Sequence, residues 1–298
     1  MMQHAPRLYA TLQQLAQQRV VFFAGLPGTG KSFLSHQLAH LAHSQQRLVH
    51  LLQWDTARPV FEASATGQRY PGRDGVTHAV IRKAVGLWAR QALVQWQHQY
   101  PEARHLLIGE TPLIGHRFLA LAAPATDTAE ALLRTACFIL PVPSRAVRLF
   151  LEAERQRRHR HPVHPQERED APPTVLQALW RELVVVAEAL GFTAPAAVLP
   201  ATLPYDPVLY QRVYTHLLRY RARRVMALDT LLPTAAFSVY DYAIARHELK
   251  PTAQEVERYI AAVEQQYPEA DVLQHEIAHW YILPQPGARG TEHGLPAH

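Results

Sequence analysis

One eight-residue stretch near the start of the chain restricts the possible folds more than any other feature. It reads Gly-Leu-Pro-Gly-Thr-Gly-Lys-Ser over residues 25–32 and fits the pattern G-x-x-x-x-G-K-[ST]. The apolar run at residues 20–24 indicates a buried strand before it, and residues 33–42 carry apolar side chains at helical spacing after it. A strand, a glycine-rich loop and a helix in that order are the context in which this pattern has functional meaning.

The residue types of this loop are those that a phosphate site needs. Three glycines allow tight turns, so that successive backbone N–H groups can point at one anion, and the start of the next helix adds its dipole. Lys31 is then expected to bind the β- and γ-phosphates of ATP, and the Ser32 hydroxyl to bind Mg²⁺. The alternative is a glycine turn that binds nothing. The residues expected to bind these cofactors are Gly25, Leu26, Pro27, Gly28, Thr29, Gly30, Lys31, Ser32 and Phe33.

The composition is that of an ordinary globular protein. The 298 residues provide ample material for a hydrophobic core, and the formal net charge of +5 fits phosphate-bearing ligands. An arginine-rich solvated surface explains this charge equally well, so it gives little support for nucleic-acid binding. A single cysteine excludes an internal disulfide, no apolar run is long enough to cross a bilayer, and the first residues lack the apolar segment of a signal peptide. These features favour the cytoplasm.

Short apolar runs alternate with helical patterns along the chain. The runs lie at residues 20–24, 47–53, 105–109, 135–142 and 224–228. This alternation predicts an α/β fold, a parallel five-stranded sheet with helices on both faces and with ligands at the carboxyl ends of the strands. We expect one domain over residues 1–233, followed by a helical C-terminal extension over residues 234–298 that ends in a frayed tail.

Two side chains directly after the second strand are candidates for contact with a substrate. Asp55 lies where a carboxylate can accept the proton of a substrate hydroxyl as that hydroxyl attacks the γ-phosphate. Arg58, three residues later, can bind an anionic group of the same substrate. The alternative is that Asp55 caps the next helix and Arg58 is solvated.

An acidic residue also follows the third strand. Glu110 comes directly after the apolar run 105–109, where a carboxylate can bind Mg²⁺ or orient a water molecule on it. Motor-type ATPases usually have Asp at this point, so Glu is a departure. The alternative role is the N-cap of a helix that starts near Thr111 and Pro112.

Basic residues cluster in two further segments. Arg155 and Arg158 lie one helical turn apart, and their guanidinium groups can close over the phosphates and neutralise transition-state charge. A solvated basic helix that pairs with its own glutamates is the alternative. Five polar residues lie in or just after a Pro-Gly turn and are candidates for the acceptor pocket: Arg73, Asp74, His78, Arg82 and Lys83. An exposed helix face explains them nearly as well.

The segment His275-Glu-Ile-Ala-His279 matches the zinc pattern H-E-x-x-H. The chain has 18 histidines, so a chance match is not surprising, and no third ligand is evident. We therefore do not predict zinc hydrolysis.

These residues resemble the P-loop kinases of small molecules, a group that includes gluconate kinase, the zeta-toxin-like ATPases and uridine kinase-like proteins. The loop at 25–32 carries the specific part of the likeness. Asp55 is similar to the phosphoryl-acceptor base of such kinases, and Glu110 to the strand-end Glu of uridine kinase-like and pantothenate kinase-like proteins. The segment 143–148, running into Arg155 and Arg158, resembles their lid, expected here over about residues 144–172. The resemblance covers roughly residues 18–160 and implies phosphoryl transfer from ATP with Mg²⁺, without supplying the acceptor.

The sequence therefore predicts an ATP-dependent phosphotransferase that acts on a hydroxyl of a small molecule. Lys31, Asp55, Arg155 and Arg158 are the expected catalytic residues, and Ser32 and Glu110 the expected metal ligands. The expected partners are ATP and the acceptor; nucleic acid and membrane are not expected, and a homodimer is left open. Two alternatives stay open: a nucleotide switch or ATPase without an acceptor, and a polynucleotide 5′-hydroxyl kinase.

Overall fold

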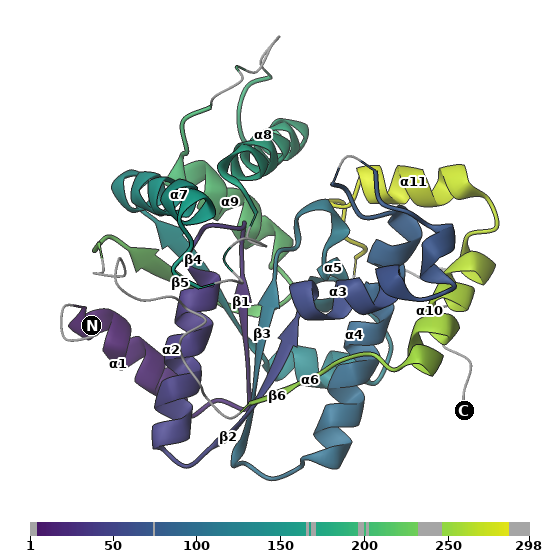
Figure 1. Ribbon diagram of the computed structural model, residues 1–298, viewed down its shortest axis with the longest axis horizontal. Helices are drawn as coiled ribbons and strands as arrows, with labels where there is room; N and C mark the ends of the chain where they lie inside the picture. The colour runs from purple at the N-terminus through teal and green to yellow at the C-terminus, as the bar shows by residue number, and fades with distance from the viewer. Residues whose placement is uncertain are drawn as a thin grey trace.

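A single parallel sheet of six strands organises the protein (Figure 1). The computed structural model describes residues 5–73, 75–164, 167, 171–195, 200, 203–231 and 246–285. The spatial order of the strands is β5-β4-β1-β3-β2-β6, and every neighbouring pair is parallel. The strands are β1 (Val20–Ala24), β2 (Leu48–Gln53), β3 (His105–Thr111), β4 (Cys137–Pro143), β5 (Ala222–Leu228) and β6 (Arg246–Glu248).

Helices cover both faces of this sheet, as the alternating pattern predicts. One face packs against α1 and α2, and the other is covered by α4, against which α10 packs from outside (Figure 1). The α-helices are α1 (Pro6–Leu15), α2 (Lys31–Ser44), α3 (Trp54–Ala63), α4 (Ala79–Gln99), α5 (Leu119–Ala122), α6 (Ala129–Thr135), α7 (Arg145–Arg160), α8 (Pro173–Ala189), α9 (Pro207–Leu217), α10 (Ala253–Gln266) and α11 (Ala270–Ala278). Two 3₁₀ turns are η2 (Gly67–Arg69) and η3 (Ile114–His116).

The central strand β1 shows why its residues form a strand. Every side chain from Val20 to Ala24 is buried. Val21 and Phe23 point into the core beneath α1 and α2, whereas Val20 and Phe22 join the core on the α4 face. A run that is apolar at every position is what a parallel strand needs, because both of its faces are covered by helices.

The sheet has one strand more than the five that the sequence predicts. The additional strand, β6, pairs with β2 at the edge of the sheet, with His50 opposite His247. It has three residues, Arg-His-Glu, and so carries none of the apolar signal by which a strand is recognised. The part after residue 233 is consequently not only helical, and a domain boundary at that point would separate β6 from its sheet. Residues 232–245 and the expected frayed tail at 286–298 lie outside the described residues.

The described helices include none that is both long enough and apolar enough to cross a bilayer.

Candidate functional site

The glycine-rich loop between β1 and α2 lies at the carboxyl ends of the strands. Gly25, Gly28 and Gly30 have φ angles of +150°, +74° and +86°, a region that residues with a side chain rarely occupy. A Cβ atom at Gly25 would lie 2.2 Å from the hydroxyl oxygen of Tyr210. Glycine at this position is therefore required both by the backbone conformation and by the close approach of α9.

Lys31 is the first residue of α2, and its ammonium group lies inside the curve of the loop. Its side chain is only 7% exposed, and Nζ donates a hydrogen bond of 2.8 Å to the carbonyl of Leu26. The Thr29 hydroxyl donates to the same carbonyl at 2.8 Å. Burial lowers the pKa of Lys31 to about 8, although the carboxylates of Glu110 and Asp55 oppose this shift. The loop thus holds a cation that has no directly bonded anion among the described residues.

The loop also presents a row of main-chain donors. Among the described residues, the amides of Gly28, Thr29, Gly30, Lys31 and Ser32 make no backbone hydrogen bond. The first N–H groups of a helix have no partner within that helix, and here they are joined by those of the loop before it. Unpaired donors around a buried ammonium are the chemistry that a polyphosphate requires, so these residues fit such a ligand.

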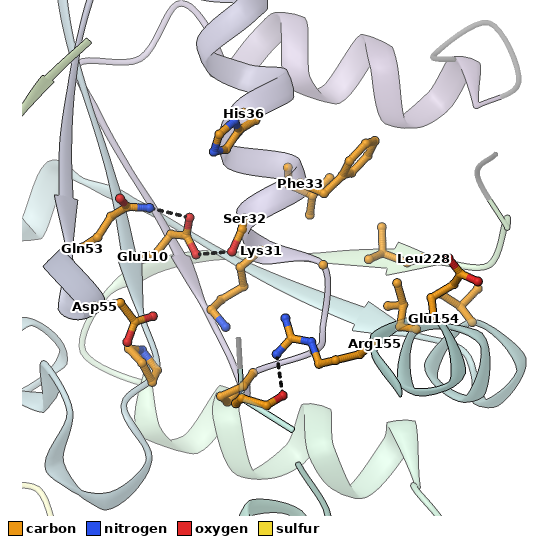
Figure 2. A pocket seen from close by; sticks show the side chains of 18 of the residues that line it. Lys31, Ser32, Phe33, His36, Gln53, Asp55, Glu110, Glu154, Arg155 and Leu228 are labelled. Atoms are coloured by element: carbon orange, nitrogen blue, oxygen red, sulfur yellow. Dashed lines mark hydrogen bonds between the residues drawn. The ribbon is translucent and has the colours of Figure 1, made fainter. Parts of the chain in front are cut away.

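A hydrogen-bonded group of three polar side chains lies beside the loop. Glu110 accepts a bond of 3.0 Å from the Ser32 hydroxyl and one of 2.9 Å from the Gln53 amide, as Figure 2 shows. The sheet register explains the contact with Gln53, because residue 53 of β2 pairs with residue 110 of β3. Burial raises the pKa of the Glu110 carboxyl, while Lys31 and both hydrogen bonds oppose that rise.

A hydroxyl next to a half-buried carboxylate is a suitable pair of oxygen ligands for Mg²⁺. The amide of Gln53 holds the carboxylate from its other side, which fixes the orientation of Glu110. The structure therefore brings together the two residues that the sequence predicts as metal ligands.

These groups open on a cavity of about 1030 Å³. Asp55, in the first turn of α3, is exposed on its wall and acts electrostatically on Lys31. Figure 2 shows the ammonium of Lys31 between the carboxylate of Asp55 and the guanidinium of Arg155. The alternative, in which Asp55 caps the next helix and Arg58 is solvated, is wrong: the N-cap of α3 is Gln53, Asp55 makes no capping hydrogen bond within the described part of the chain, and Arg58 pairs with Glu62. Its position in α3 is what presents the carboxylate to the cavity.

The helix α7 supplies arginines to the opposite wall. Arg155 and Arg158 both line the cavity; Arg155 Nη1 donates to the carbonyl of Ala171 at 3.3 Å, and Arg158 Nη1 lies 2.7 Å from Glu167 Oε1. Glu154 is a second carboxylate near Arg158, at 3.7 Å. The predicted lid thus corresponds in its described part to α7 and to the segment that leads into α8, while residues 165–166 and 168–170 lie outside the described residues.

Arg148, which the sequence did not single out, contacts the loop directly. It is 1% exposed, and its Nη1 donates to the carbonyl of Pro27 at 2.9 Å while its Nε pairs with Glu152 at 2.7 Å. Its guanidinium would also lie 3.2 Å from a Cβ at Gly28. Arg148 therefore connects α7 to the glycine-rich loop and fixes the position of the loop.

The residues predicted to contact the acceptor separate in space. Arg58 lines the cavity and pairs with Glu62 at 2.5 Å. Arg73, His78, Arg82 and Lys83 are not among the residues that line the cavity, and Asp74 lies outside the described residues. His78 caps α4, and its ring accepts from the amide of Val80 at 3.2 Å. Arg73 lies in an exposed turn. The turn itself reaches the cavity through Gly75 and Thr77, but the side chains of His78, Arg82 and Lys83 bond within the protein instead of lining the cavity.

Arg82 has a supporting role instead. Its Nε donates to the carbonyl of Thr77 at 2.7 Å and its Nη1 to that of Gly115 at 3.0 Å. Thr77 and the neighbouring Arg117 both line the cavity. Arg117 and Gln53 are residues of the site that the sequence did not single out, because no local motif marks them and only the register and the loop after β3 bring them there.

The H-E-x-x-H segment lies in the last turn of α11 and at its C-cap, and none of its residues line this cavity. The rings of His275 and His279 lie with their centroids 4.2 Å apart, but Glu276 forms an ion pair with Lys83 of α4 and accepts from the hydroxyl of Tyr267. Across the described ranges, no three metal-binding side chains gather into one group. The glutamate of the motif therefore connects α11 to α4.

Comparison of the chain with protein-family models, with curated proteins and with solved structures gives no match. The geometry of the site is therefore what supports a function.

Proposed function

We propose that the protein is an ATP-dependent phosphotransferase that moves the γ-phosphate of ATP to a hydroxyl of a small molecule. The observation that carries the proposal is the shared cavity: it joins the buried ammonium of Lys31 to the exposed carboxylate of Asp55, with the Ser32–Glu110 pair beside them. A phosphate-binding loop opposite a free carboxylate is the arrangement that phosphoryl transfer to an alcohol needs.

Each residue has a distinct task in this proposal. The loop amides and Lys31 bind the phosphates, and Asp55 accepts the proton of the attacking hydroxyl. The new bond joins the acceptor oxygen to the γ-phosphorus, and the bond from that phosphorus to the bridging oxygen breaks, so that ADP leaves. Arg155 and Arg158 add positive charge on the far side of the cavity, where charge develops in the transition state.

Ser32 and Glu110 would hold Mg²⁺, which supplies charge neutralisation at the phosphates when it is bound. Gln53 keeps the Glu110 carboxylate turned toward Ser32 through its hydrogen bond to Oε1. This positioning leaves the second oxygen of Glu110, which bonds Ser32, at the edge of the phosphate loop.

The variant Asp55→Asn tests the proposal. The amide has nearly the shape of the carboxylate but cannot accept the proton, so transfer from γ-labelled ATP to a pool of metabolites should fall by about two orders of magnitude or more. ATP affinity, measured by calorimetry, should stay close to that of the unaltered protein. An unchanged turnover rate would remove Asp55 from the mechanism, and absence of ATP binding in the unaltered protein would refute the proposal as a whole.

One observation favours a second candidate, an ATPase that acts without an acceptor. Glu110, held by Ser32 and Gln53, is placed where a carboxylate can orient a water molecule. Such a protein would release phosphate at the same rate with and without the metabolite pool, and Asp55→Asn would leave that rate unchanged while Glu110→Gln would abolish it.

A further inference from the structure

The short loop between β3 and α5 has an unusual backbone. Three residues that are not glycine have φ angles in the left-handed region: Leu113 at +61°, His116 at +70° and Phe118 at +57°. Gly115, between them, has φ +60°. Side chains disfavour this region, and residues held there against that preference concentrate at functional sites. The loop begins directly after Glu110 and Thr111, at the edge of the candidate site.

Many contacts hold this loop in its unfavourable conformation. The Tyr214 hydroxyl donates to the carbonyl of Pro112 at 2.7 Å, and the amide of Leu113 donates to the carbonyl of Arg117 at 2.9 Å. The side chains of Leu113, Ile114 and Phe118 are fully buried in the core. Burial of these apolar side chains offsets the backbone strain, so the loop is a rigid support.

The side chain that this support presents to the cavity is Arg117. Within the described part of the chain, the guanidinium of Arg117 forms no ion pair within 4 Å, and its one side-chain hydrogen bond is a long contact of 3.5 Å from Nη1 to the carbonyl of Ile114. Burial lowers the pKa of its guanidinium, and the carboxylates of Glu182 and Asp55 oppose this shift. A half-buried guanidinium with most of its donors available is a site for an anion.

The guanidinium of Arg58, unlike that of Arg117, already has a carboxylate partner. Arg58 is paired with Glu62, whose other oxygen accepts a bond of 3.0 Å from the Thr77 hydroxyl. The two arginines lie in the same region, because the charges of Arg58, Asp55 and Glu182 all shift the pKa of Arg117. Arg117 is therefore the guanidinium next to Asp55 that retains capacity for a ligand.

We propose that Arg117 binds an anionic group of the acceptor, so that the substrate is a hydroxy compound that carries its own carboxylate or phosphate. This inference rests on the proposed phosphotransferase function. Arg117 and Asp55 would then contact the same acceptor molecule at two points. The guanidinium of Arg117 binds the anionic group, and the carboxylate of Asp55 receives the proton of the hydroxyl. Bidentate recognition of this kind orients the hydroxyl for attack.

The test uses matched sets of three-, five- and six-carbon polyols, each offered as the neutral alcohol, the sugar acid and the phosphate ester. Label transfer from γ-labelled ATP is measured for the full chain and for Arg117→Gln and Arg117→Lys. We expect transfer to acids or phosphate esters in preference to neutral alcohols, and the acid and ester arms identify which anion is recognised. Arg117→Gln should raise the KM for the anionic acceptor by about tenfold to a hundredfold. Arg117→Lys should raise it by less, because lysine keeps the charge but loses the paired N–H donors of the guanidinium.

Two readouts separate this inference from the proposed function. The KM for ATP should be unchanged in both variants, and Arg104→Gln, an exposed arginine at the opposite end of β3, should behave like the unaltered protein. Transfer to neutral alcohols that is insensitive to Arg117→Gln would overturn the inference and leave the phosphotransferase intact. Absence of transfer to every compound, together with acceptor-independent phosphate release, would refute both.

Discussion

Burial of the Lys31 ammonium has a measurable consequence for ligand binding. Its pKa is lowered from 10.5 to about 8 in the unliganded protein because the side chain is buried. A polyphosphate bound by the loop would bring negative charge against Nζ and restore the pKa to near its ordinary value. Between these two values, binding must therefore take a proton from the solution.

The size of this uptake follows from the two pKa values. At pH 8.5 about a quarter of the free protein carries a proton on Lys31, whereas nearly all of the complex does, so binding takes up about 0.75 proton. At pH 7 about nine-tenths of the free protein is already protonated, and the uptake falls to about 0.1 proton.

Calorimetry of ATP binding in buffers of different ionisation enthalpy measures this number directly. The apparent binding enthalpy should depend on the buffer at pH 8.5 and hardly at pH 7. Lys31→Arg is the matched control, because arginine remains charged throughout this range and should bind ATP without proton uptake. Tight binding at pH 8.5 with the same enthalpy in every buffer would refute the reasoning.

The same shift predicts how the unliganded protein responds to alkaline pH. The unfolded chain holds the Lys31 proton up to pH 10.5, and the folded chain releases it near pH 8. The unfolded state therefore binds more protons in this interval, and the contribution of Lys31 to the free energy of unfolding rises with pH by about 3 kcal/mol. Denaturant titrations at pH 7.5 and pH 10 should show about 2.4 kcal/mol of this rise in the unaltered protein and lack it in Lys31→Met.

Three further outcomes test the loop and its surroundings. Gly25→Ala should lower the free energy of unfolding by about 3 kcal/mol in denaturant titrations. Addition of Tyr210→Phe should recover part of that loss, because it removes the oxygen that lies 2.2 Å from the new Cβ. If nothing is recovered, the loss of stability comes from the backbone angle at residue 25 alone. Arg148→Met should cost about 2 kcal/mol in the same assay, since it leaves the half-buried carboxylate of Glu152 without its ion-pair partner. A neutral effect would exclude a structural role for the contact with the loop. Glu110→Gln should raise the Mg²⁺ concentration for half-maximal turnover by about tenfold or more, and an unaltered Mg²⁺ dependence would remove Glu110 from the metal site.

The features that the sequence predicts well are those determined by neighbouring residues. The strand, loop and helix around Lys31 follow from apolar runs, glycines and helical spacing within one short segment. Asp55 and Glu110 are also found in this way, because each directly follows a recognisable strand and parallel strands end at the same edge of a sheet.

Features that depend on pairing between distant segments are not predicted. Gln53 contacts Glu110 only because of the register of β2 against β3. Arg117 reaches the cavity only because Leu113, His116 and Phe118 adopt positive φ angles, which these residue types do not predict. Arg82 shows the opposite case: its charge and position suggest a ligand contact, but two carbonyl groups occupy its donors.

The position of β6 determines where the chain can be shortened. Removal of everything after residue 231 would leave the outer edge of β2 without its partner, and the main-chain groups around Val49 and Leu51 would become available to other molecules. Bare edges of this kind promote self-association, so a protein trimmed to its first 231 residues should precipitate where the full chain remains dispersed. The loss would extend to the cavity, since Arg246 and Glu248 form part of its lining. The segment Arg246–Glu248 is thus a structural component both of the sheet and of the cavity at its edge.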